Sequence, residues 1–283
     1  MVKKYNKTNM IKYSCLVVLL FMISSCNTEE YAIDNLNGNK IGIFGHGGMG
    51  SGITYPSNTS ESILKCISLG ADGSEFDVQL TKDSVLIAFH DHDLGDNTNF
   101  SGLVNSLNWA EIKGAYYTNI PFLEYDVISL DELFSTIDNL HDYQFTFDCK
   151  LISDQEKIED YYHSYINAIA RIIDKYELIN NVLIESQNEE FLSLLQNSNT
   201  DYKLFIYPTS FEKGLAIAKK MKLYGISIST KNVSKEQIEV AHENNFRITI
   251  WSVNSRKKNK AAVRKNPDFI QTDRLSHLIS ILE

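Results

Sequence analysis

The chain has 283 residues, of which 43% are hydrophobic and 22% charged, with 36 acidic and 27 basic side chains. This length and apolar fraction exclude a disulfide-stapled miniprotein and a disordered chain, and they suffice for a large core. The formal net charge is −9. Such an acidic surface is a poor partner for nucleic acid or an anionic membrane, so we expect no nucleic-acid partner.

The first 25 residues have the pattern of an export signal. Lysines precede the apolar run 15–23, which at about 1.5 Å per residue reaches roughly 14 Å, under half of a ~30 Å hydrocarbon core. A run this short is typical of a cleaved signal peptide and not of a membrane span. Residues 23–26 also resemble a bacterial lipobox, in which the cysteine is lipidated. The alternative is an ordinary secretory signal in which Cys26 has no role.

We therefore expect residues 1–25 to be a lipoprotein signal peptide, Cys26 the lipidated N-terminus, and residues 26–39 a polar tether. Loss of four lysines with the signal would take the net charge from −9 to −13. The expected location is exported and membrane-anchored through the lipid, in a bacterial periplasm or at an outer membrane. Cys66 and Cys149 lie in apolar surroundings, which favours two buried free thiols over a disulfide.

From Lys40 onward, β-rich runs alternate with helical patterns. Strands are predicted at Ile41–His46, Ser74–Leu80, Val85–His90, Gln144–Lys150, Val182–Ser186, Leu204–Tyr207, Gly225–Ser229, Arg247–Val253 and Phe269–Gln271. Helices are predicted at Ser60–Leu69, Asn108–Lys113, Leu130–Asn139, Gln155–Lys175, Glu189–Gln196, Phe211–Met221, Lys235–Asn244 and Arg256–Lys265.

This alternation predicts βαβ units and a parallel sheet. Only residues 81–84 separate the second and third strands, which is too short for a parallel crossover, so these two are expected to form a hairpin. Eight strands then remain for an α/β fold of the TIM (β/α)8 barrel type. No linker interrupts residues 40–283, which we expect to be one barrel domain.

The glycine-rich run 45–50 matches the spacing G-x-G-x-x-G of dinucleotide-binding proteins. That fingerprint requires a helix to open at its third glycine, so that the helix N-terminus faces the pyrophosphate. Residues 51–56 intervene here before any helical pattern. The run is better interpreted as a loop that lets the backbone approach a ligand.

Two carboxylates, Glu75 and Asp77, lie on one face of a predicted strand because side chains alternate with period 2. In a barrel interior they would be costly unless they bind a cation; the alternative is a solvated edge strand. His46 and His90 each end an apolar strand, where the active sites of barrels lie. Asp148 and Lys150 share a face at the end of another strand, which alone is also consistent with a buried salt bridge.

These residues fall in motifs that resemble the glycerophosphodiester phosphodiesterase family of the PLC-like phosphodiesterase superfamily. The matching runs are His46-Gly47-Gly48, Pro56-Ser57-Asn58-Thr59, the block 70–83, His90-Asp91, Asp148-Cys149-Lys150, 251–254 and 270–273. The resemblance covers about residues 41–274. It implies a PLC-like barrel that uses a divalent cation held by Glu75, Asp77 and Asp148, with His46 and His90 as the acid–base pair.

The sequence departs from the family at the phosphate-binding arginine, which is Gly47, and at a nearby glutamate, which is Ser57. An arginine is also replaced within 95–98, and Asp148 stands for a longer glutamate. Losing one Arg and one Glu together leaves the pocket charge unchanged, which favours a re-tuned pocket over a decayed one. We expect an arginine restored at position 47 to strengthen phosphate binding.

The chemistry of phosphodiester cleavage fits these residues. A cation must polarise the phosphoryl oxygens and lower the pKa of a hydroxyl group, and hard oxygen ligands favour Ca²⁺ or Mg²⁺. Three carboxylates, Lys150 and a divalent cation sum to zero, so the site can accept a small-molecule anionic phosphodiester. Lys150 would contact phosphate and Trp251 could form a wall of the pocket. Two histidines can exchange protons near neutral pH, in either order.

The expected activity is hydrolysis of a glycerophosphodiester to glycerol phosphate and an alcohol. One alternative is a barrel phosphodiesterase for another head group, phosphoinositide-like or sphingolipid, and another is an inactive binding lipoprotein that has lost catalysis. A glycoside hydrolase would also use paired carboxylates, but it leaves both histidines and Lys150 unexplained. The sequence leaves the oligomeric state, the metal and the released alcohol open.

Overall fold

Eight parallel strands close into a barrel because β1 (Gly42–His46) pairs with both β10 and β2. The order around the barrel is β1-β10-β9-β8-β7-β6-β5-β2. The other seven strands are β2 (Gly73–Leu80), β5 (Gln144–Cys149), β6 (Val182–Ser186), β7 (Lys203–Ile206), β8 (Gly225–Ser229), β9 (Arg247–Val253) and β10 (Phe269–Thr272). The computed structural model describes residues 31–50, 54–153 and 157–283. The predicted TIM barrel is confirmed.

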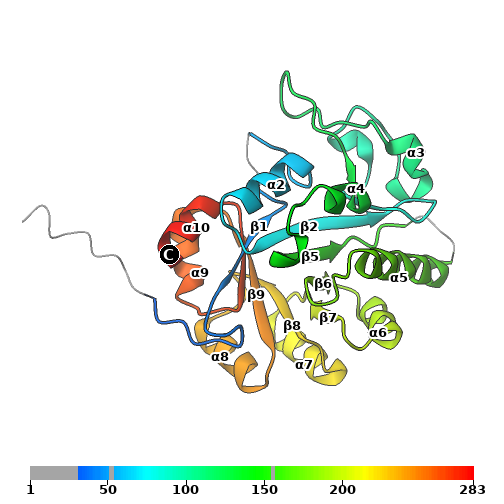
Figure 1. Ribbon diagram of the computed structural model, residues 1–283. Coiled ribbons are helices and arrows are strands. Elements are labelled where there is room, and N and C mark those ends of the chain that lie inside the picture. The colour runs from blue at the N-terminus through cyan, green and yellow to red at the C-terminus, as the bar shows by residue number, and fades with distance from the viewer. Residues whose placement is uncertain (1–30, 51–53, 154–156) are drawn as a thin grey trace, which may run out of the picture. The chain divides into compact units, whose positions relative to one another are not determined.

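Helices follow the strands and surround them (Figure 1). They are α2 (Ser60–Ser68), α3 (Trp109–Ile112), α4 (Leu130–Ser135), α5 (Ile158–Lys175), α6 (Glu189–Ser198), α7 (Phe211–Met221), α8 (Lys235–Glu243), α9 (Arg256–Val263) and α10 (Leu275–Leu282). The last of these was not predicted. No helix among the described residues is both long enough and apolar enough to cross a membrane.

Two short antiparallel strands extend the sheet from the barrel strand β2. The strand β3 (Leu86–Ala88) pairs antiparallel with β2, with Val78 opposite Ala88, and β4 (Ile128–Ser129) pairs with β3. The predicted hairpin of the second and third strands is therefore correct. Of the described strands, only β3 and β4 lie outside the barrel order. After β3 the Phe89 N–H donates a hydrogen bond of 3.0 Å to the Asp77 carbonyl, which brings the next residue, His90, to Asp77.

Period-2 alternation along β2 decides which side chains enter the barrel. Phe76 packs outward against Phe134 of α4 and Phe147 of β5, at ring-centroid distances of 6.2 and 5.4 Å. Its neighbours Glu75 and Asp77 consequently face the interior. Burying the aromatic layer between barrel and helices is thus what holds two carboxylates in the centre.

The compact unit begins at Ile33, earlier than the expected boundary at Lys40. Asn35 Nδ2 donates a hydrogen bond of 2.8 Å to the Pro267 carbonyl, and Arg247 donates one of 3.2 Å to the carbonyl of Leu36. These bonds attach the end of the expected tether to the barrel. The expected signal peptide and Cys26 lie outside the described residues. Both remaining cysteines are buried and free, as predicted.

Candidate active site

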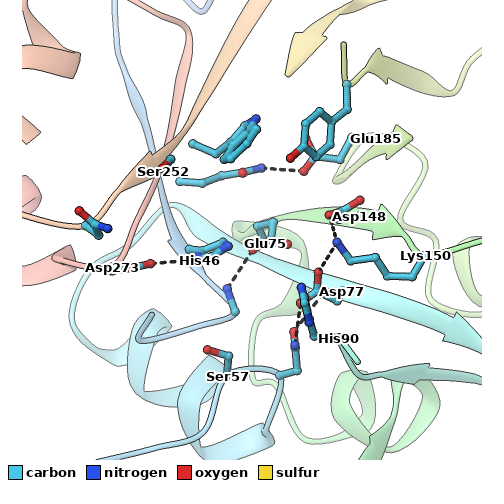
Figure 2. A pocket seen from close by; sticks show the side chains of 16 residues that line it. His46, Ser57, Glu75, Asp77, His90, Asp148, Lys150, Glu185, Ser252 and Asp273 are labelled. Carbon is cyan, nitrogen blue, oxygen red and sulfur yellow. Dashed lines mark hydrogen bonds and ion pairs between the residues drawn. The ribbon is translucent and has the colours of Figure 1, made fainter. Parts of the chain in front are cut away.

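A cavity of about 420 Å³ opens at the carboxyl ends of the barrel strands (Figure 2). Seven of the eight sequence-predicted site residues line it, and the eighth, Cys26, lies outside the described residues. They come from β1, β2, the segment after β3, the end of β5, and β9: His46, Glu75, Asp77, His90, Asp148, Lys150 and Trp251. Barrel closure therefore brings together side chains that are far apart in sequence.

The three predicted metal ligands form one buried group. Glu75, Asp77 and Asp148 each offer a carboxylate oxygen, and these oxygens lie within 4.8 Å of one another. Two oxygens that each lie about 2.4 Å from one Ca²⁺ can be at most about 4.8 Å apart. The three carboxylates are therefore spaced for a single divalent cation.

Burial and mutual repulsion disfavour the charged form of this group. Burial raises the pKa of the Glu75 carboxyl well above its usual range, with Asp77 and Asp148 adding to the effect and His46 opposing it. Burial likewise raises the pKa of Asp148, against the opposing charge of Lys150. A divalent cation would reverse these shifts, since an opposite charge favours the ionised carboxylate.

Lys150 lies between two of the three acids, as Figure 2 shows. Its Nζ is 2.9 Å from Asp77 Oδ1 and 2.5 Å from Asp148 Oδ2. Burial acts to raise the pKa of Asp77, but Lys150, His90 and Asn58 together outweigh burial and hold that pKa below its usual value. Lys150 thus places a positive charge in the cavity, beside the Asp77 and Asp148 carboxylates and within reach of a bound phosphate.

Asn58 fixes the orientation of Asp77 from two sides. Its Nδ2 donates to Asp77 Oδ2 at 2.8 Å, and its Oδ1 accepts from the Asp77 backbone N–H at 3.0 Å. Asn58 has a φ of +68°, in the left-handed region that asparagine tolerates. The next residue, Thr59, caps α2 by accepting from the Ser62 N–H. The start of one helix therefore holds a candidate metal ligand in place.

His46 is paired with Asp273, the residue that directly follows β10. Its Nδ1 lies 2.8 Å from Asp273 Oδ1, which leaves Nε2 for a substrate. Burial lowers the pKa of His46, but the Asp273 hydrogen bond and the charge of Glu75 outweigh burial and raise it to about 10. This imidazole therefore holds its proton at neutral pH.

His90 differs from His46 in its surroundings. Its side chain is 64% exposed, and its Nδ1 lies 2.8 Å from Oδ1 of the adjacent Asp91. Asp91 is held in turn by Asn97. The two histidines thus line the same cavity, each with its Nδ1 held by a carboxylate, and the His46 side chain is the less exposed of the two at 45%.

Comparison with known proteins agrees with this geometry. The Glycerophosphoryl diester phosphodiesterase family matches residues 49–277. The chain belongs to this family. Among its relatives, the glycerophosphodiester phosphodiesterases of Caldanaerobacter subterraneus subsp. tengcongensis and Bacillus altitudinis are 25% and 26% identical, over 82% and 85% of this chain and 95% and 98% of theirs.

Solved structures of the family share the fold. A putative glycerophosphoryl diester phosphodiesterase from Silicibacter pomeroyi has a TM-score of 0.74 and 19% identity, covering 86% of this chain and 93% of its own. A phosphodiesterase from Oleispira antarctica, in complex with the product sn-glycerol-3-phosphate, has a TM-score of 0.71 and 16% identity, covering 84% and 95%. The protein is accordingly a phosphodiesterase with the family's barrel.

The two departures from the family pattern, Gly47 and Ser57, lie side by side. Gly47 has a φ of +57°, and a Cβ built on it would be 2.5 Å from the Ser57 Cβ. Its N–H donates to Glu75 Oε2 at 2.9 Å. An arginine at position 47 therefore meets both backbone strain and a close contact with Ser57, which oppose the gain in phosphate binding expected from that single replacement.

Several residues of the cavity were not assigned from the sequence. Asn58 and Asp273 lie in motifs that were noted, but their pairing with Asp77 and His46 depends on contacts across the barrel. Glu185 stands beside Asp148 in the register of β5 and β6, and burial, then Asp148, raise its pKa to about 7. An acid near the end of an apolar strand, as in residues 182–186, is the signal that could have identified it.

Proposed function

We propose that this protein hydrolyses glycerophosphodiesters to glycerol phosphate and an alcohol in a metal-dependent reaction. The observation that carries the proposal is the convergence of three carboxylates, Lys150 and two histidines on one cavity at the carboxyl end of the barrel. Family membership supports the same reaction class. The product named for the Oleispira antarctica relative supports glycerol phosphate as the product here.

The donor set suits Ca²⁺ or Mg²⁺. Glu75, Asp77 and Asp148 would hold the ion, because all three ligands are hard carboxylate oxygens spaced for one cation. A bound cation would polarise a phosphoryl oxygen and lower the pKa of the attacking water. The Asp148 side chain is one methylene shorter than the glutamate of the family motif. The backbone of β5 would therefore have to lie closer to the cation for Asp148 to bind it.

The two histidines divide the proton transfers. His46 would act as the general acid, because Asp273 holds its proton in place, and would protonate the departing alcohol oxygen. His90 would act as the general base and take the proton of the attacking water. The water oxygen then bonds to phosphorus as the phosphorus–alcohol bond breaks. Lys150 would bind a phosphate oxygen, and Trp251 would form a wall beside the substrate.

We also propose that the protein is an exported lipoprotein anchored through Cys26. The support is the sequence of residues 1–26, with its lysines, short apolar run and small residues before a cysteine. A location outside the cytoplasm would place the enzyme among diesters released from membrane lipids.

The test is a panel of glycerophosphodiesters with choline, ethanolamine, inositol and glycerol head groups, assayed for both products. We expect release by the metal-loaded protein, loss of release in EDTA, and recovery on adding Ca²⁺ or Mg²⁺. Asp77→Asn should keep the fold by circular dichroism and lose most of the activity. No turnover with any head group and either cation, or turnover indifferent to EDTA, contradicts the proposal.

A further inference from the structure

The segment between α3 and α4 carries a short apolar loop that the rest of the fold leaves uncovered. Within the described residues, the two most exposed large apolar side chains are Phe122, at 104% exposure, and the adjacent Leu123, at 53%. Pro121 precedes them and is also exposed. We call residues 121–123 the apolar tip. In Figure 1 the segment between α3 and α4, to which the tip belongs, projects away from the barrel.

The chain on both sides of the apolar tip is fixed to the barrel. The Tyr117 N–H donates a hydrogen bond of 2.9 Å to the Tyr125 carbonyl across the base of the loop. Tyr125 is buried, and its hydroxyl donates to the Thr54 carbonyl at 3.1 Å. Tyr117 packs against Phe89, with ring centroids 5.9 Å apart. The base of the loop therefore lies next to His90, which follows Phe89 and lines the active-site cavity.

The hydrophobic core of this segment does not use the apolar tip. Among the described residues, that core includes Val104 and Ile112, and Ile120 packs against it from the loop, whereas Phe122 and Leu123 take no part in it. Phe122 also has a φ of +67°, a left-handed conformation that is rare for a bulky side chain and is typical of functional sites. Full exposure of the ring and strain of its backbone are both unfavourable in water, which indicates that a partner covers the tip.

The shape and the charge of the loop favour a neutral lipid surface as this partner. Aromatic and leucine side chains insert at the boundary between lipid head groups and acyl chains, and a projecting tip enters a fluid layer without a preformed hollow to receive it. Glu124 directly follows the tip and Asp126 lies two residues further on, both exposed, in a chain of net charge −9. These charges are repelled by anionic head groups, so the lipid that fits is zwitterionic.

The expected lipid anchor would bring the apolar tip to such a surface. The compact unit begins at Ile33, seven residues after Cys26. Seven extended residues span at most about 25 Å, so an acylated Cys26 would keep the folded unit close to the bilayer. A contact of only two or three apolar residues is weak alone, but tethering raises its effective concentration.

We propose that the apolar tip, residues 121–123, inserts into a zwitterionic lipid surface and sets the orientation of the anchored protein. The active-site cavity then opens beside the lipid surface, because the base of the loop packs next to His90. The inference goes beyond the proposed phosphodiesterase function. It uses the proposed anchor at Cys26 only to bring the tip to the membrane.

The test places a tryptophan at the apolar tip. Full-length lipidated Phe122→Trp is reconstituted into phosphatidylcholine vesicles, with and without bromine on the acyl chains near the head groups, and the emission of the two native tryptophans is subtracted with the wild type. Bromine quenches tryptophan on contact, so the added emission should fall about two-fold or more in brominated vesicles. Val240→Trp is the matched control, since Val240 is an exposed apolar residue of α8, across the barrel from β2, and should not be quenched.

The outcome of this test does not depend on turnover, so it stands apart from the proposed activity. Quenching of Phe122→Trp no greater than that of Val240→Trp overturns the proposal and leaves the apolar tip to a protein partner. Quenching that grows when phosphatidylglycerol is added to the vesicles overturns the choice of a zwitterionic surface. If mass spectrometry finds no acyl chain on Cys26, the anchor fails by itself, and the same comparison at saturating vesicle concentration still decides whether the tip inserts.

Discussion

Replacing Lys150 by methionine should destabilise the metal-free protein far more than the metal-bound one. Lys150 Nζ lies 2.9 Å from Asp77 and 2.5 Å from Asp148, and the side chains are 23%, 9% and 13% exposed. These fractions place the ion pairs in the buried regime, where removing one partner costs about 3–5 kcal/mol, and not in the surface regime of about 0–1 kcal/mol. We expect a loss of this order in EDTA at pH 7.

Saturating Ca²⁺ should remove much of that loss, because a cation among the same carboxylates replaces the missing positive charge. The assay is urea unfolding of both proteins, in EDTA and in Ca²⁺. An equal loss of unfolding free energy in the two conditions, or a loss under 1 kcal/mol in EDTA, would refute the view that Lys150 and the cation neutralise one shared group of acids.

The free energy of unfolding should depend on pH in opposite directions, through Asp77, with and without Lys150. The folded pKa of Asp77 is lowered in wild type, so its contribution to stability is present above the unfolded pKa of about 3.9 and is lost as pH falls through the folded value. In Lys150→Met, burial raises that pKa instead. The metal-free variant should therefore gain stability between pH 7 and pH 5, where wild type does not gain through this group.

Three further predictions concern other parts of the chain. Gly47→Arg should lower the melting temperature and not improve phosphate binding, because its φ of +57° and the Ser57 contact oppose a side chain; a stable variant with lower KM would contradict this. Asp273→Asn should lower the pKa of His46, so the alkaline limb of the pH–kcat/KM profile should move to lower pH; an unmoved limb would show that another group sets it. Cys26→Ser should leave the protein without acyl chains by mass spectrometry, whereas normal acylation would exclude the lipoprotein assignment.

The barrel could be predicted from the sequence because its strands are short, apolar and regularly spaced. The predicted second and third strands are separated by only residues 81–84, so chain connectivity alone required them to be antiparallel, as they are in the structure. The helix Leu275–Leu282 was missed. Its polar face is only Ser276, His277 and Ser280, and eight residues are too few for the helical period to stand out in the sequence.

The candidate ligands and histidines could be found because each lies in or just after a predicted strand and within a local motif. Their partners could not be found in this way. Asp273 is 227 positions from His46, and the contact exists only because β10 closes the barrel onto β1. Glu185 is brought beside Asp148 by the register of two strands separated by a whole helix. Such pairings depend on strand register and closure, which no local pattern specifies.

The most direct test of the account is the position of the cation. Crystals grown without metal and soaked in MnCl₂ would give an anomalous difference map in which Mn²⁺ stands in for Mg²⁺ or Ca²⁺. We predict one strong peak in coordination distance of a carboxylate oxygen from each of Glu75, Asp77 and Asp148, and no such peak in Asp77→Asn. A map with no peak among these three carboxylates, or with the same peak in the variant, would contradict the proposed metal site and the mechanism built on it.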